Sequence, residues 1–267
     1  MPPKQKTLSP VKPNAGISAA YQKRLDALVD EMHASLVYWL GAAYKAKPPL
    51  IAADDKRKYR GTPSAVMRRV MRALSKRWRK RFDVAAVELA EHFSKAIADR
   101  SDRALAASLR KAGISVAFKP TAAMNDALQA SIGENVALIK SIGDQHLAEV
   151  EGLVLRSVSV GRDIGTLGKE LEKRYGITKR RASLIARNQN QLATATMQRA
   201  RYVELGIKEA IWCHSAGGKE PRPSHVEAGR KRLRYDVAEG ALIDGEYIQP
   251  GEKINCRCFA KPVIEGF

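Results

Sequence analysis

The sequence contains no run of about 18 apolar residues, the length at which a segment becomes a candidate membrane-spanning helix. It has 3 cysteines in 267 residues, and an odd, sparse set does not build the disulfide framework of a small secreted protein. The first residues are rich in proline and lysine, with no apolar stretch behind them, unlike a secretory signal. We therefore expect a protein of a reducing compartment that has no contact with a membrane.

The sequence also lacks the short motifs that mark common catalytic sites. It has no glycine-rich phosphate loop, no nucleophile elbow and no signature of paired carboxylates. His33, His92 and His146 lie within expected helices, where a single histidine is usually a structural residue. We expect that the protein is not an enzyme and assign no catalytic residue. An intrinsic nuclease fold within 207–267 is the enzyme alternative.

Acidic residues are too few to balance the basic ones. The chain has 47 Lys and Arg against 28 Asp and Glu, which gives a formal net charge of +19. A field of this sign raises the local concentration of polyanions, of which nucleic acid is the commonest. Hydrophobic residues make up 45% of the sequence, which is enough for a packed core. The composition indicates a folded protein with a negatively charged partner.

Apolar residues recur at spacings of three and four over most of the first 205 residues, as in helices that bury one face. The first stripe includes Leu25, Met32, Leu36 and Trp39, and Lys47-Pro48-Pro49 ends that helix because proline breaks the hydrogen-bond ladder. The pattern predicts helices over about 17–46, 63–99, 121–158, 163–175 and 178–205. Gly176 would separate the last two, with Thr178 as the N-cap. A helix–turn–helix has a similar turn, so a sequence-specific DNA-binding regulator is an alternative.

The expected fold class is mainly α, with a long-helix bundle or hairpin followed by a small α+β C-terminal module. After Gly206, glycine and proline become frequent and the apolar runs become short, which is typical of such a module. The expected organisation is a flexible basic arm at 1–14, a long-helical domain with a basic face at 15–160, a helical lead-in at 161–206 and the small module at 207–267.

Every charged residue between positions 56 and 81 is basic. These residues are Lys56, Arg57, Lys58, Arg60, Arg68, Arg69, Arg72, Lys76, Arg77, Arg79, Lys80 and Arg81. Like charges repel at helical spacings, so a helix that keeps them is expected to bind a polyanion. We predict non-specific binding of double-stranded DNA through its phosphates. Two alternatives remain: a solvated face whose long side chains cover apolar surface, and a surface that binds an acidic partner protein.

The last third of the chain contains a candidate metal site. Cys213, His225, Cys256 and Cys258 could offer three thiolates and one imidazole to Zn²⁺, which prefers four such ligands in a tetrahedron. A zinc ion would stabilise a module with little core of its own. His214 is a competing ligand. In the alternative interpretation, Cys256 and Cys258 point to opposite faces of a strand and His225 only binds backbone.

Several motifs within about 160–265 occur in the order and spacing of a known family. They are Trp212-Cys213-His214, Arg222-Pro223-Ser224-His225, Gly229, Pro250-Gly251 and Asn255-Cys256-Arg257-Cys258. The arrangement resembles the phage Mu protein F-like head morphogenesis family. Trp212, Arg222, Ser224 and Arg257 are its structural motif residues, and the two arginines could pair with Asp236, Glu239 or Asp244 to hold the loops, or could contact phosphates. Asn188-Gln189 and the segment 215–218 depart from the family, which often has acidic residues there.

The resemblance implies a minor head protein of a tailed bacteriophage, a structural capsid component that acts in head morphogenesis and capsid assembly at the portal vertex. The implied partners are the portal protein, other head proteins and double-stranded DNA, which is bound without sequence preference. The implied location is the head of the virion, with the host cytoplasm as the place of assembly. A nucleic-acid-cleaving, toxin-like enzyme is the alternative in another class.

Overall fold

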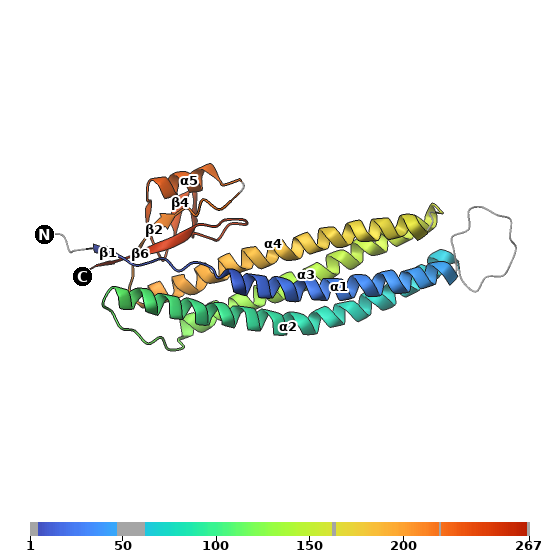
Figure 1. The fold of residues 1–267 in the computed structure, drawn as a ribbon, viewed down its shortest axis with the longest axis horizontal. Coiled ribbons are helices and arrows are strands. Elements are labelled where there is room, and N and C mark those ends of the chain that lie inside the picture. The colour runs from blue at the N-terminus through green and yellow to red at the C-terminus, as the bar shows by residue number, and fades with distance from the viewer. Residues whose placement is uncertain (1–4, 47–61, 162–163, 219, 266–267) are drawn as a thin grey trace. The chain divides into compact units, whose positions relative to one another are not determined.

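The computed structural model describes residues 5–46, 62–161, 164–218 and 220–265 (Figure 1). Four long helices come first in the chain: α1 (Ala15–Ala46), α2 (Pro63–Lys111), α3 (Ala122–Ser159) and α4 (Ile164–Glu204). The short helix α5 (Pro223–Arg230) lies among the strands β1 (Gln5–Thr7), β2 (Glu209–Cys213), β3 (Arg234–Asp236), β4 (Ala241–Ile243), β5 (Glu246–Ile248) and β6 (Phe259–Glu265). The predicted fold class, mainly α with a small C-terminal module of strands, is confirmed.

Two helix boundaries differ from the prediction. The helix that begins at Pro63 continues to Lys111 instead of ending near 99, because Leu105 and Leu109 extend its buried face. The segment after Gly161 forms one helix, α4, where the sequence predicted two. The expected proline stop at 47–49 lies outside the described residues.

Gly176 lies inside α4 and does not end a helix. Thr178 is not an N-cap, because its hydroxyl donates to the carbonyl oxygen of Arg174 one turn earlier, at 3.0 Å. A glycine costs about 1 kcal/mol in a helix, which the burial of Leu171 and Ala182 on the same helix offsets. The predicted break was wrong, and without a turn this segment contains no helix–turn–helix.

The chain forms two compact units, and α1 to α4 each contribute residues to both. The sheet unit consists of Met1–Ala20, Ala90–Glu134 and Ala186–Phe267. The bundle unit consists of Tyr21–Leu89 and Asn135–Ile185. These units differ from the expected organisation, because each takes part of the segment 15–160.

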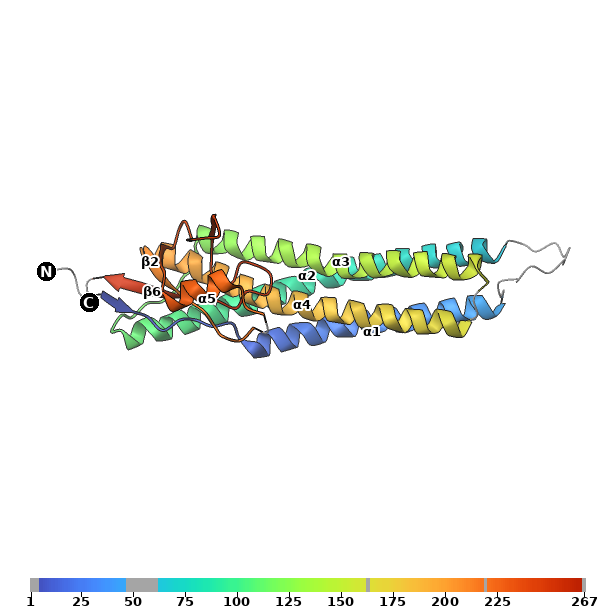
Figure 2. The ribbon, with the colours of Figure 1, turned by 90° about the horizontal axis from the view of Figure 1, so that it is seen from above.

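The bundle unit contains four antiparallel helical segments that lie alongside one another (Figure 2). Ion pairs link each helix to its neighbour around the bundle: Arg24–Glu88, Arg79–Asp144, Arg174–Glu149 and Lys179–Asp30. Leu36 and Leu40 fill the core from α1, so Trp39, which was expected on the buried stripe, is 48% exposed.

The sheet unit joins the two ends of the chain. Its antiparallel sheet has the order β1-β6-β2-β3, and β4 and β5 form a separate hairpin. β1 pairs with β6, and Leu8 and Val11 behind it are buried in the same core as Tyr202 and Trp212. The expectation of a flexible arm was therefore wrong for the described residues 5–14. No helix among the described residues combines the length and apolar character that a bilayer crossing requires.

Candidate functional site

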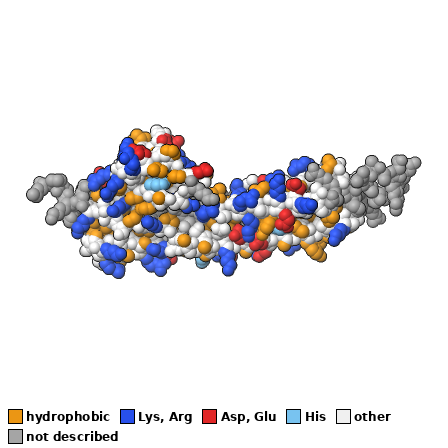
Figure 3. Space-filling view, turned by 45° about the horizontal axis from the view of Figure 1, so that its top comes forward, with side chains coloured by type: hydrophobic (Ala, Val, Ile, Leu, Met, Phe, Trp, Pro, Cys, Tyr) orange, Lys and Arg blue, Asp and Glu red, His pale blue; other side chains and the backbone are white. Residues whose placement is uncertain are grey.

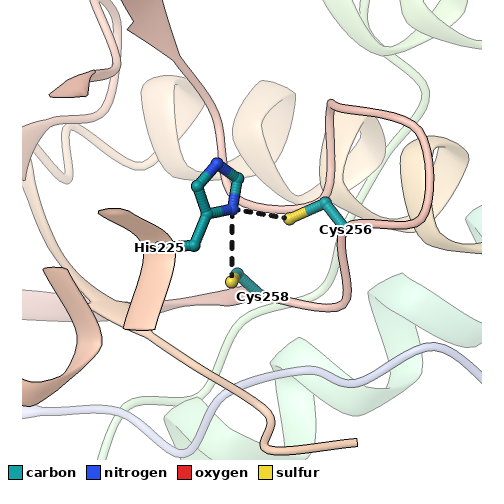
Figure 4. A group of neighbouring side chains, drawn as sticks. All are labelled: His225, Cys256 and Cys258. Carbon is teal, nitrogen blue, oxygen red and sulfur yellow. Dashed lines mark hydrogen bonds between the residues drawn. The ribbon is translucent and has the colours of Figure 1, made fainter. Parts of the chain in front are cut away.

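His225, Cys256 and Cys258 lie together in the sheet unit, and all three are buried (Figure 4). The Nδ1 atom of His225 is 3.4 Å from Sγ of Cys256 and 3.8 Å from Sγ of Cys258. The histidine comes from α5, and both cysteines come from the loop between β5 and β6. We call these three residues the cysteine–histidine cluster.

Local backbone features bring these segments together. Pro223 starts α5, where its fixed φ suits a first helical turn, and this places His225 near the start of the helix. Asn255 has a φ of 62°, a turn conformation that asparagine tolerates. Its backbone N–H donates to Asn188 Oδ1 at 3.0 Å. Both cysteines precede β6 and face one imidazole, so they do not alternate across a strand as the alternative interpretation required.

Cys213 does not join the cluster, although the sequence predicted it as a ligand. Successive side chains alternate along β2, so the burial of Trp212 against the His225 ring turns Cys213 the other way. His214 comes close instead, with its Nδ1 3.6 Å from Sγ of Cys258. Gly229 of α5 leaves room for His214 at this position, because a Cβ on residue 229 would lie 2.5 Å from the Cβ of His214.

The two buried thiols lie beside the same imidazole, and their interaction shifts their pKa values in opposite directions. The neighbouring side chain of Cys258 lowers the pKa of Cys256 to about 5. The same interaction, together with burial, raises the pKa of Cys258. A lowered thiol pKa favours the thiolate, which is the form that binds metal ions and acts as a nucleophile.

The structural motif residues hold the loops around the cluster. Arg222 donates to the carbonyl oxygen of Ile254 at 3.1 Å, and Arg257 donates to the carbonyl oxygen of Gly217. Ser224 donates to the carboxylate of Asp244 at 2.6 Å. The suggested pairing of the two arginines with Asp236, Glu239 or Asp244 was wrong, because both arginines bind backbone oxygens.

Amide side chains of α4 bind the backbone of the cluster loop and of the segment between β1 and α1, and the sequence reasoning missed them. Gln191 donates to the carbonyl oxygen of Cys258 at 2.7 Å, and Gln198 donates to that of Val11 at 2.9 Å. The signal was present as a run of four amides, residues 188–191, within a helical pattern. In the structure Asn190 and Gln191 of this run donate to backbone oxygens of other segments, those of Asn14 and Cys258.

The basic residues of α2 form a second candidate surface. Lys56, Arg57, Lys58 and Arg60 lie outside the described residues. The others are exposed, and we call them the α2 basic strip: Arg68, Arg69, Arg72, Lys76, Arg77, Arg79, Lys80 and Arg81. Arg79 pairs with Asp144 and Arg81 with Glu31, whereas the rest of the strip has no ion-pair partner among the described residues.

The opposite face of α2 explains why the strip is exposed. Met67, Met71, Leu74 and Trp78 recur at spacings of three and four and are buried in the bundle unit. Basic side chains are not confined to α2, since Figure 3 shows them spread over the visible face with acidic ones among them. What distinguishes the strip is the absence of any acidic residue between positions 68 and 81 of α2.

The fold and the site define a long-helix protein that carries a small module with a cysteine–histidine cluster. Residues 148–261 match the family model of phage Mu protein F-like proteins, and this span includes the whole cluster. The predicted resemblance is confirmed over this C-terminal part of the chain. An uncharacterised protein of Haemophilus influenzae is 34% identical over 134 residues, which cover 49% of this chain and 28% of that protein. The chain thus spans well under half of that relative's length, and no solved structure matches the chain.

Proposed function

We propose that this protein is a minor head protein of a tailed bacteriophage, a structural component that acts in head morphogenesis. The observation that carries the proposal is the match of residues 148–261 to the phage Mu protein F-like family. The matched span contains α4, α5, the strands β2 to β5 and the loop contacts around the cluster, so the resemblance covers a folded and internally bonded part of the protein. The proposal requires no turnover chemistry.

The proposed partners are the portal protein and the other head proteins at the portal vertex, and the proposed location is the head of the virion. Double-stranded DNA is a further proposed partner, bound without sequence preference. Its support is the α2 basic strip, where Arg68, Arg69 and Arg72 are exposed and have no ion-pair partner among the described residues. Long unpaired cations on a rigid helix suit phosphates, which any sequence presents alike.

The test of the head assignment is incorporation into assembling particles. The gene is deleted from the phage genome that carries it, and a tagged copy is supplied in trans. We expect the tagged protein in purified proheads or heads, by immunoblot, and fewer infective particles from the deletion. A tagged β-galactosidase supplied in the same way is the control for trapping. Heads that form in normal number without the protein, together with particles from which the tagged chain is absent, would contradict the proposal.

A further inference from the structure

We propose that the sheet unit binds one Zn²⁺ ion through Sγ of Cys256 and Cys258 and through Nδ1 of His225 and His214. The proposal goes beyond the head function and does not depend on it. It also differs from the ligand set predicted from the sequence, because His214 takes the place of Cys213.

The distances between the ligand atoms suit a tetrahedral zinc site. Zn–S bonds of about 2.3 Å and Zn–N bonds of about 2.0 Å, arranged as a tetrahedron, place sulfur and nitrogen about 3.5 Å apart. The His225 nitrogen lies 3.4 Å from Cys256 and 3.8 Å from Cys258, and the His214 nitrogen lies 3.6 Å from Cys258. The side chains thus already have the spacing that a shared ion requires.

Three of the four ligand atoms are fully assembled, and the fourth is adjacent. The atoms of His225, Cys256 and Cys258 all lie within 4.8 Å of one another. His214 contacts Cys258 alone, but it is half-buried and lines a cavity of about 260 Å³ together with the cluster. This space leaves room for the His214 ring to turn toward Cys256. The side chain of Cys213 points to the opposite face of β2.

Bonds from outside the cluster hold the ligands in place, as is usual around metal sites. Gln191 fixes the backbone of Cys258, and Asn188 fixes the residue before Cys256. Trp212 is fully buried, and its indole N–H makes no regular hydrogen bond among the described residues. Its ring lies edge-on to the ring of His225, with the centroids 5.1 Å apart, so it packs directly against this ligand.

A buried ion with four protein ligands has no open position, which is the pattern of a structural zinc site and not of a catalytic one. Here it would connect the end of β2, the start of α5 and the loop before β6. β3, β4 and β5 have only three residues each, so the module has little backbone pairing to hold these segments together. The binding free energy of the ion would add directly to the stability of the sheet unit.

The experiment measures metal content and coordination in the full-length protein. Protein purified with zinc in the medium should contain about one Zn²⁺ per chain by elemental analysis. Replacement by Co²⁺ should give the intense visible bands of a tetrahedral site and thiolate-to-cobalt charge-transfer bands. Zinc should protect Cys256 and Cys258 from alkylation, as read by mass spectrometry of the wild-type protein, and should leave Cys213 reactive. Full-length protein that takes up no metal after reconstitution, or equal alkylation of all three thiols with and without zinc, would overturn the proposal.

Matched variants decide the identity of the ligands. Cys213→Ser should bind the metal like the wild-type protein, whereas His214→Ala should bind it more than about 100-fold more weakly, since even outer partners of metal ligands contribute 10- to 100-fold. His214→Cys should restore tight binding with a third thiolate, which shows up as stronger charge transfer. Because this variant gains a signal, it stays informative if His214→Ala folds poorly. Loss of metal in Cys213→Ser, or wild-type affinity in a folded His214→Ala, would refute the four-ligand set.

Discussion

At the scale of single residues, His146 shows how burial sets a charge state. It lies inside the bundle unit with its Nδ1 2.7 Å from the Thr178 hydroxyl, while its Nε2 has no hydrogen-bond partner among the described residues. Burial, together with the smaller effect of the nearby His33, lowers the pKa of His146 to about 4. The expectation of a structural histidine fits this environment, because a neutral ring at pH 7 adds no charge to the core.

We expect the free energy of unfolding to decrease as the pH falls from 7 to 5. The unfolded chain takes up the His146 proton near its ordinary pKa of about 6.5, whereas the folded protein takes it up only near 4. The unfolded state therefore binds more protons between these values, and acid favours it. At pH 5 the loss from this residue should be about 2 kcal/mol, which urea unfolding at the two pH values measures.

The comparison variant for this prediction is His146→Gln, which keeps a polar group beside Thr178 but does not titrate. It should lose most of the pH dependence that the wild-type protein shows between pH 7 and 5. His92→Gln, which changes an exposed histidine on α2, should leave that dependence intact. An unchanged dependence in His146→Gln would mean that other groups cause the acid sensitivity.

The metal ligands show the limit of sequence reasoning at this scale. Cys213 and His214 are neighbours in the chain, and the composition of a zinc site fits either one. The choice depends on which face of β2 meets α5, and the burial of Trp212 against His225 fixes that face. Pairing of β2 with β3 and β6 determines this orientation, and residue types alone do not reveal it.

At the scale of elements, the prediction of α4 gave too much weight to the cost of glycine within a helix. Gly168 and Gly176 both lie within this helix. A Cβ at Gly176 would come no closer than 3.7 Å to Arg180, and a Cβ at Gly168 would meet nothing within 4 Å. Neither glycine has a positive φ or a close neighbour, so neither marks a turn or a tight contact. Both are ordinary helical positions, and the helix continues through them.

Gly176→Ala should raise the stability of the protein by about 0.5–1 kcal/mol, because alanine loses less backbone entropy in a helix and fits without a clash. Gly143→Ala in α3 should do the opposite, by about 1 kcal/mol or more, because its Cβ would lie 2.8 Å from the buried ring of Phe82. Thermal or urea unfolding of both variants measures the two shifts. Destabilisation by Gly176→Ala would indicate a turn at this position instead of a continuous helix.

The strands were the elements that sequence could predict least. Long helices follow from local apolar periodicity, which is why α1 and α3 were found almost to their ends. β1 has three residues and pairs with residues 263–265 at the other end of the chain. No local pattern carries that pairing, and the prolines around Leu8 and Val11 suggested an unstructured arm although both side chains are buried.

At the scale of the whole molecule, the excess of positive charge is the property from which the DNA proposal starts. A net charge of +19 attracts any polyanion, so binding alone would not distinguish a DNA-contacting surface from general attraction. The α2 basic strip is a specific candidate because most of its residues are exposed and have no ion-pair partner among the described residues. A decisive test must therefore change the position of charge loss while keeping its amount constant.

Unrelated DNA duplexes of equal length should bind the full-length protein with equal affinity, and binding should weaken steeply with salt. The triple variant Arg68→Gln, Arg69→Gln and Arg72→Gln should bind more weakly, because each lost phosphate contact removes about 0.9 from the slope of log K against log salt. Fluorescence anisotropy titrations at several salt concentrations give both quantities. The slope should become shallower by about 2 to 3 if all three arginines contact phosphates.

The matched control is Lys169→Gln, Lys173→Gln and Arg180→Gln, which removes the same charge from exposed positions on α4. General attraction would make the two triple variants equally weak, since both lose three positive charges. If the strip contacts phosphates, only the α2 variant should show a shallower slope of log K against log salt, because counterions are released only where a side chain meets a phosphate. Equal losses would reduce the strip to a solvated helix face, and a wild-type protein that ignores duplex DNA in dilute buffer would remove DNA from the proposed partners.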